Sequence, residues 1–344
     1  MQRVAAIASD AKRSGRVHFG LPGSFKLLAL AACLSVGACG PQAPPENAPQ
    51  AEVDADWAQI PEDTAWGEVS AVDTDSHGHV FVLQRAGRVW EEPFPSDPVA
   101  EPVVSMFAPN GTLLASWGVG ETVMPHGLSV DAEDKVWITD VQREQLLRFS
   151  HDGTLEMTLG ERGVSGADHT HFGRPADVAF DGDKVFVADG YVNSRIIVFD
   201  REGHYLAQWG HEGSGGGGLA IPHSVAVKDG KVYVADRENA RIRIYSEAGR
   251  LLQSLDTPGY PYAVKPLGQG YFVSLEGRDA GERTGAIIRV WRPDGTVERI
   301  LDARGPGSTK GHDLAIGADG TIYVADVEGR RVLALELAQR TKDD

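Results

Sequence analysis

Three histidines recur at the same place in alternate copies of an internal repeat. They lie within Met124–Leu128, Ile221–Val225 and Lys310–Leu314, as His126, His223 and His312. Each opens a strand-like run that ends near an Ala-Asp or Thr-Asp pair, and two intervening copies carry Ala176 and Tyr262 instead. If the repeats stack radially, the three imidazoles meet at one axis. Three imidazoles suit a zinc ion with one open position, as in catalytic sites.

The repeat itself predicts the fold. Six units begin near Ser70, His126, Ala176, His223, Tyr262 and His312. Short β-branched and aromatic runs alternate with Asp-Gly or Glu-Gly turn pairs, so each unit of about 40–50 residues holds about four antiparallel strands. We predict an all-β, six-bladed β-propeller over residues 57–340, with a pattern that resembles the NHL-type repeat. A pair of β-sandwiches is the alternative, but it does not explain a register kept six times.

A propeller brings equivalent residues to one ring around its channel. The three histidines come from the second, fourth and sixth units, so they form a triangle on that ring. The other histidines of the predicted propeller lie in turns or between units and are assigned no role: His77, His79, His151, His169, His171, His204 and His211. The stretch from Asp168 to His171 resembles a metal-binding pair, but it has no equivalent in other repeats.

Charge and hydropathy exclude some partners. The formal net charge of the 344-residue chain is −16, and no basic stripe is visible, which argues against nucleic acid. No apolar run reaches transmembrane length. We expect the protein to act as a monomer.

The N-terminus has the pattern of a bacterial lipoprotein. A basic segment and an apolar run from Leu27 to Val36 precede Gly37-Ala38-Cys39, which predicts a signal peptide over 1–38 with Cys39 lipidated. The alternative is an ordinary cleaved signal with an incidental cysteine. Residues 39–56 are rich in Pro, Ala and acid, like a flexible tether. We therefore expect a lipid-anchored protein of the bacterial cell envelope, without a disulfide because the only other cysteine is Cys33.

Several motifs resemble one enzyme family, peptidyl-α-hydroxyglycine α-amidating lyase. The resemblance covers about residues 57–338 and rests on the segments Leu83–Arg85, Val89-Trp90, Met124–Ser129, His171-Phe172, Asp189–Arg195, Pro222–Ser224, Ala235–Asn239 and Gly311–Asp313. It implies a lyase that cleaves a peptide with a C-terminal α-hydroxyglycine, or a similar N-acyl carbinolamide, into an amide and glyoxylate.

The resemblance also implies roles for particular residues. The three histidines that bind zinc in the family match His126, His223 and His312, and the family's catalytic base matches Tyr191. Such a base needs neighbouring cations to lose its proton at neutral pH, and two active-site arginines match Arg85 and Arg237; one of them is expected to bind the substrate carboxylate. A structural calcium matches the carbonyls of Val72 and Leu128 and the carboxylate of Asp313, all hard ligands.

Two departures from the family pattern concern the site. A disulfide of the animal members matches Gly173 and Val192 here, so the tyrosine loop is held otherwise or is looser. A Met-Pro pair before the last histidine is replaced by Lys310-Gly311, which affects pocket shape. Two other functions remain open at this point: a non-catalytic propeller that binds a protein or glycan, and a lactonase-like calcium propeller.

Overall fold

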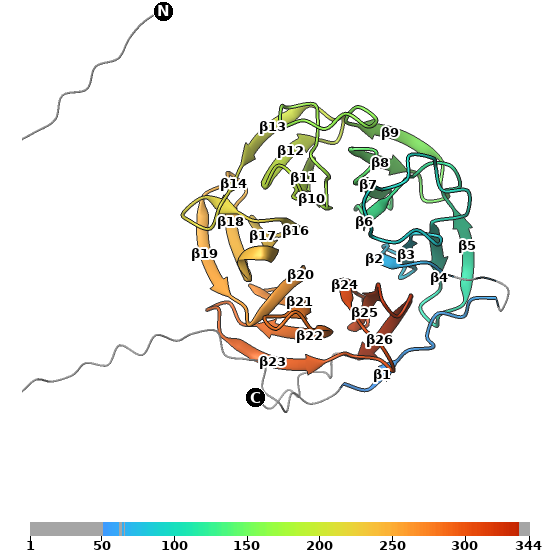
Figure 1. The fold of residues 1–344 in the computed structure, drawn as a ribbon. Coiled ribbons are helices and arrows are strands. Elements are labelled where there is room, and N and C mark those ends of the chain that lie inside the picture. Colours follow the sequence, from blue (N-terminus) through green and yellow to red (C-terminus); the bar gives the residue numbers. More distant parts are fainter. Residues whose placement is uncertain (1–50, 62–63, 65, 337–344) are drawn as a thin grey trace, which may run out of the picture. The chain divides into compact units, whose positions relative to one another are not determined.

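The structure is a computed structural model that describes residues 51–61, 64 and 66–336, and these residues form the predicted six-bladed β-propeller (Figure 1). Each blade is a four-stranded antiparallel sheet. The first strand of each blade lines the central channel, and the last lies at the rim. The described residues contain one helix, the single 3-10 turn η1 (Arg237–Asn239).

The strands follow the chain from blade to blade. Blade 1 holds β2 (Val69–Thr74), β3 (Val80–Gln84), β4 (Val104–Phe107) and β5 (Leu113–Trp117); blade 2 holds β6 (Pro125–Val130), β7 (Val136–Asp140), β8 (Gln145–Phe149) and β9 (Leu155–Leu159); blade 3 holds β10 (Asp177–Asp181), β11 (Lys184–Asp189), β12 (Arg195–Asp200) and β13 (Tyr205–Trp209). Blade 4 holds β16 (Pro222–Lys228), β17 (Lys231–Asp236), β18 (Arg241–Ser246) and β19 (Leu251–Asp256); blade 5 holds β20 (Gly259–Gly268), β21 (Tyr271–Asp279), β22 (Thr284–Trp291) and β23 (Val297–Asp302). A small parallel pair, β14 (His211–Glu212) and β15 (Gly218–Leu219), precedes blade 4.

Blade 6 is completed by both ends of the described fold. Its inner strands are β24 (Gly311–Ile316), β25 (Thr321–Asp326) and β26 (Arg331–Glu336), and its outer strand is β1 (Val53–Asp54), paired antiparallel to β26. The predicted propeller starts at residue 57, and the predicted tether ends at residue 56. The structure instead includes β1 in the ring, because this short strand caps the open edge of β26.

The core lies between neighbouring blades, where apolar faces of adjacent sheets meet. One such layer joins blades 1 and 6, where the Trp57 ring lies 5.5 Å from that of Phe107 and 4.8 Å from that of Tyr323. Blade-to-blade packing of this kind fixes where each inner strand stands around the channel.

A buried aspartate at the end of the second strand explains the recurring Ala-Asp and Thr-Asp pairs. Asp236 accepts hydrogen bonds from the backbone N–H of Ala220 and from Arg241 Nε, both at 2.6 Å. Asp140 similarly accepts the N–H groups of Val123 and Met124. These carboxylates therefore hold the segments that lead into the inner strands carrying the histidines.

Within the described residues, no helix has the length and apolar character of a membrane span. The predicted signal peptide (1–38) and most of the predicted tether (39–56) lie outside the described residues.

Candidate active site

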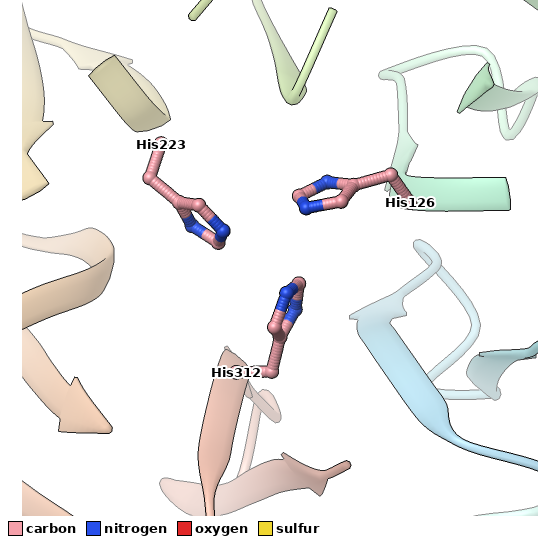
Figure 2. A group of neighbouring side chains, drawn as sticks. All are labelled: His126, His223 and His312. Carbon is pink, nitrogen blue, oxygen red and sulfur yellow. The ribbon is translucent and has the colours of Figure 1, made fainter. Parts of the chain in front are cut away.

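The three ring histidines lie together on the channel axis (Figure 2). Their ring centroids are 4.8–4.9 Å apart, and all three side chains are buried. Each sits where the pairing of its inner strand shifts: between Pro125 and Leu128 in β6, and at the equivalent places in β16 and β24. A β-bulge leaves one residue out of the ladder and re-aims its side chain. The bulges thus turn the imidazoles into the channel.

Backbone carbonyls of the next blade fix the tautomer of each ring. The Nδ1 atoms of His126, His223 and His312 donate to carbonyl oxygens at 2.8, 2.7 and 2.6 Å, those of Ala176, Tyr262 and Ser70 respectively. A carbonyl only accepts, so each Nδ1 carries the proton and each Nε2 keeps its lone pair.

Electrostatics keep the rings neutral. Burial, with smaller effects from nearby arginines and from the neighbouring imidazoles, holds the pKa of all three imidazoles well below the usual value. The three potential ligand nitrogens lie within 4.8 Å of one another, and Nε2 of His223 is buried without a hydrogen-bond partner in the part of the chain that the structure describes. Neutral, preoriented imidazoles around one point fit a zinc ion.

Tyr191 stands beside this ring. It follows β11, and its hydroxyl donates to Nε2 of His126 at 2.9 Å. Arg237, which follows β17, donates from Nη1 to the same hydroxyl oxygen at 3.1 Å, and its guanidinium lies 5.2 Å from the tyrosine ring. Although burial opposes its charge, Tyr191, Tyr262 and Glu238 raise the pKa of Arg237 above its usual value. The tyrosine oxygen is therefore held between Nε2 of His126, a potential metal ligand, and the guanidinium of Arg237.

Arg85 follows β3 and reaches the same end of the channel. Its side chain is buried, with Nε donating to the Pro125 carbonyl at 3.1 Å and Nη1 to Glu68. Burial lowers the pKa of Arg85 despite Glu68. Its Nη2 is buried and has no hydrogen-bond partner among the described residues. The Trp90 ring lies 5.0 Å from the guanidinium carbon of Arg85 and 5.0–5.5 Å from the rings of Tyr191 and His126, so it packs between Arg85 and the three histidines.

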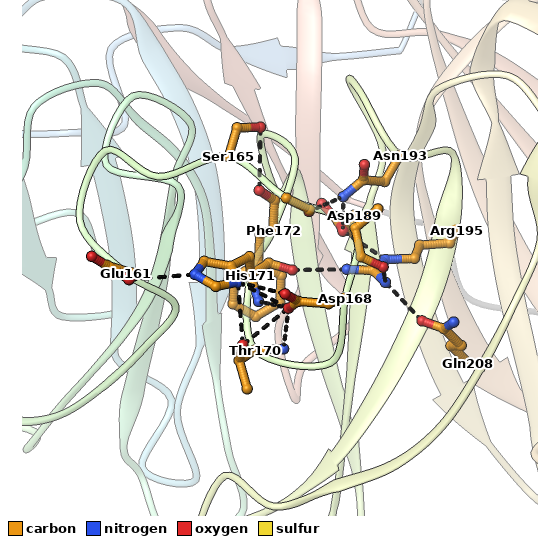
Figure 3. Close-up of polar contacts among 12 residues, drawn as sticks. Glu161, Ser165, Asp168, Thr170, His171, Phe172, Asp189, Asn193, Arg195 and Gln208 are labelled. Atoms are coloured by element: carbon orange, nitrogen blue, oxygen red, sulfur yellow. Dashed lines mark hydrogen bonds and ion pairs between the residues drawn. The ribbon is translucent and has the colours of Figure 1, made fainter.

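Hydrogen bonds hold the loop around Tyr191 at the two positions, Gly173 and Val192, where the family resemblance implies a disulfide in the animal members. The N–H of Val192 donates to the Gly173 carbonyl at 3.0 Å, so these positions are neighbours. Asp189 binds Gly173 N–H, Asn193 and Arg195 at 2.7–2.8 Å (Figure 3). The Asn193 side chain also fills the space beside Gly173, 2.7 Å from where a Cβ would stand. The loop is thus fixed by a buried carboxylate network.

The residues matched to calcium lie on the inner strands β2, β6 and β24. Asp313 accepts the N–H of Val72 at 3.2 Å and that of Leu314 at 2.8 Å. Burial raises its pKa to about 7, although Lys265 lowers it. A buried carboxylate whose pKa is raised would be stabilised in its ionised form by a hard cation.

Lys265 of β20 was not identified in the sequence. Burial alone would lower its pKa, but Asp73, Asp313 and Asp177 raise it above the usual value. Its ammonium is therefore a resident positive charge that competes with any ion for these carboxylates.

Tyr262 occupies the ring position of blade 5, next to Arg237 at 4.9 Å and Lys310 at 5.6 Å. Its place in the repeat was visible in the sequence, but its contact with both cations was not. Lys310, the departure from the family pattern, is therefore part of the site wall.

The Asp168–His171 stretch does not form a metal site with converging rings. His171 bonds to Asp168 at 2.9 Å and to Glu161 at 3.4 Å (Figure 3). His169 instead stacks on Tyr205 at 3.8 Å. The two imidazoles serve different contacts.

Comparison with known proteins decides the family. The chain is 32% identical over 313 residues to peptidylglycine alpha-amidating monooxygenase of Rattus norvegicus, covering 80% of this chain and 31% of that protein. It is 31% identical over 296 residues to "Probable peptidyl-alpha-hydroxyglycine alpha-amidating lyase" of Caenorhabditis elegans, covering 79% of this chain and 83% of that protein. The chain belongs to the peptidyl-α-hydroxyglycine α-amidating lyase family. The resemblance inferred from the motifs is therefore confirmed, and the chain spans about a third of the length of its longer mammalian relatives.

Two further comparisons support the fold. The NHL repeat model matches residues 219–245, which include β16 and β17 and most of β18. A solved streptogramin B lyase superposes with a TM-score of 0.53 at 15% identity, covering 83% of this chain and 97% of that one. That structure shares the fold.

Proposed function

We propose that this protein is a zinc-dependent lyase, held at a membrane by a lipid anchor, that cleaves peptidyl-α-hydroxyglycine, or a similar N-acyl carbinolamide, to an amide and glyoxylate. The observation that carries the proposal is the Tyr191 hydroxyl, 2.9 Å from Nε2 of His126 within a ring of three neutral imidazoles. Zinc would bind Nε2 of His126, His223 and His312, taking the lone pair of His126 that otherwise accepts from Tyr191, and would supply Lewis acidity to the substrate hydroxyl.

Tyr191 acts as the general base. It takes the proton from the carbinol oxygen, whose electron pair forms the aldehyde C=O while the C–N bond breaks toward nitrogen. Tyr191 then gives this proton to the departing amide nitrogen, so the products are a neutral amide and glyoxylate and the tyrosine is ready for the next substrate. The hydrogen bond from Arg237 Nη1 holds the tyrosine oxygen in position for this proton transfer.

Arg85 binds the substrate carboxylate. Within the described residues its Nη2 is a buried donor without a partner, whereas Nη1 of Arg237 donates to Tyr191 and Nε of Arg237 donates to Glu238. An unpaired buried N–H is costly, so a carboxylate that satisfies it gains affinity. Glu68 and the Pro125 carbonyl hold this guanidinium in place.

A calcium ion held by the carbonyls of Val72 and Leu128 and by Asp313 would brace the inner strands. Asp313 directly follows His312, so the ion would steady one zinc ligand. The N-terminal Cys39 would tether the domain to an envelope membrane, which gives the enzyme access to exported peptides.

Glyoxylate release from α-hydroxyhippurate tests the proposal. Purified protein should contain about one tightly bound zinc at the ring and release glyoxylate, and His223→Ala should remove both. A folded protein without metal or turnover would instead indicate a propeller that only binds a partner.

A further inference from the structure

Two turns at the far end of blades 1 and 2 bring together a second group of histidines. The turn after β2 carries Asp75, His77 and His79, and the turn between β8 and β9 carries His151. Arg85 and Tyr191 follow second strands, at the opposite end of the blades. The second group is therefore separate from the ring at His126.

One buried oxygen is the focus of this group. Oδ2 of Asp75 lies 2.7 Å from Nδ1 of His79 and 2.8 Å from Nε2 of His151, and the Asp75 side chain is fully buried. These three ligand atoms all lie within 4.8 Å of one another. The His77 ring stands next to both imidazoles, at centroid distances of 5.9 and 6.3 Å.

The protein holds these groups in position. Oδ1 of Asp75 accepts the backbone N–H groups of His77 and His79 at 2.9 and 2.7 Å, so the carboxylate cannot turn freely. The ring of Phe81 supports His151 edge-on at 5.3 Å. Ser76, in the same turn, binds Asp134 of blade 2 through both N–H and hydroxyl, at 2.9 and 2.7 Å. Preorganised ligands from two blades distinguish this group from a chance surface cluster.

We infer that Asp75, His79 and His151 form a second transition-metal site, for zinc or another divalent ion that prefers imidazole and carboxylate ligands. Two imidazole nitrogens and one carboxylate oxygen match the zinc sites in which the protein supplies three ligands and the fourth position stays open. Nδ1 of His77, 3.9 Å from Asp75 Oδ2, stands near the remaining position. Its side chain is 65% exposed, so water can take that position instead. The bound ion would join blade 1 to blade 2 by coordination.

A turn in blade 3 offers a matched comparison. Asp200 and His204 repeat the spacing of Asp75 and His79, with a Nδ1–Oδ2 distance of 2.9 Å. No second imidazole bonds to Asp200 in the described residues. The pair therefore has one histidine fewer than the proposed site and should not hold zinc tightly.

Zinc stoichiometry of the full chain tests the inference. Metal-free wild-type protein, titrated with Zn²⁺ by calorimetry and analysed after gel filtration, should retain about two equivalents. The double variant His79→Ala/His151→Ala should retain about one and keep lyase activity, whereas His204→Ala should retain about two. Zinc should also raise the Tm of wild-type protein further than that of the double variant, because only the wild type gains the cross-blade link.

Three outcomes would overturn the inference. The first is a wild-type protein that retains only one equivalent of zinc and loses it only in the His223→Ala variant. The second is a double variant that binds as much zinc as the wild type. The third is a loss of zinc in the His204→Ala control. A metal-free Tm of the double variant equal to that of wild-type protein shows that the substitutions do not act through unfolding. If this Tm falls, His151→Gln, which keeps a polar side chain of similar size, replaces the double variant in the same titration.

Discussion

Replacing Tyr191 with phenylalanine tests the proposed base. The change removes one oxygen, which makes two hydrogen bonds: to His126 Nε2 at 2.9 Å and from Arg237 Nη1 at 3.1 Å. The aromatic ring and its packing against Trp90, at 5.0 Å, remain. Loss of a general base lowers the rate by about 10²–10⁴-fold, or roughly 3–5 kcal/mol of barrier.

Stability should change much less than rate. The variant leaves one donor of the buried Arg237 without its partner, at a cost of about 1–3 kcal/mol, while the other contacts of the guanidinium persist. The three imidazoles keep their carbonyl partners, so zinc content should stay the same. The expected signature is therefore a large fall in kcat with bound zinc and a modest fall in Tm.

The assay is glyoxylate release from α-hydroxyhippurate, measured together with zinc content and Tm. Tyr262→Phe is the matched control: this tyrosine also contacts Arg237, but burial raises the pKa of its hydroxyl, which suits it poorly to act as a base. We expect the control to keep activity within about tenfold of wild type. Turnover by Tyr191→Phe at the unmodified rate would refute the assignment of the base.

Four other perturbations give distinct results. Arg85→Lys keeps the charge but not the planar fork, so KM should rise by about 10–100-fold while zinc stays bound; an unchanged KM would contradict carboxylate binding by this residue. Gly127→Ala places a Cβ 2.4 Å from the carbonyl that orients His126, so zinc affinity should fall, and equal affinity by calorimetry would count against this steric account. Lys265→Met removes a competing cation, so calcium should raise the Tm of this variant more than that of wild type; an equal shift would argue against the calcium site. Cys39→Ser should abolish incorporation of labelled fatty acid and membrane recovery, and continued labelling would contradict the predicted anchor.

Much of the fold follows from the repeat. Periodic strands and turn pairs give six blades, and the alternation of His126, His223 and His312 places three imidazoles on one ring, which the structure brings together at 4.8–4.9 Å. The first strand, β1, was not predicted, because two residues paired across the whole chain leave no periodic signal.

Side chains without a repeat equivalent escape such reasoning. Asp75 and His151 are 76 positions apart, and their contact depends on two turns meeting between blades. From the sequence alone Lys265 would be predicted as an exposed residue of a β-strand, because its acidic neighbours lie on other inner strands. The free donor of Arg85 likewise depends on which partners its other nitrogens find.

The most direct test of the shared metal ion is a crystal structure with anomalous diffraction recorded on both sides of the zinc absorption edge. We predict one zinc peak on the channel axis, about 2.0–2.1 Å from Nε2 of each of His126, His223 and His312. No peak on the axis of zinc-supplemented protein, or a peak bound by only one of these imidazoles, would contradict the account.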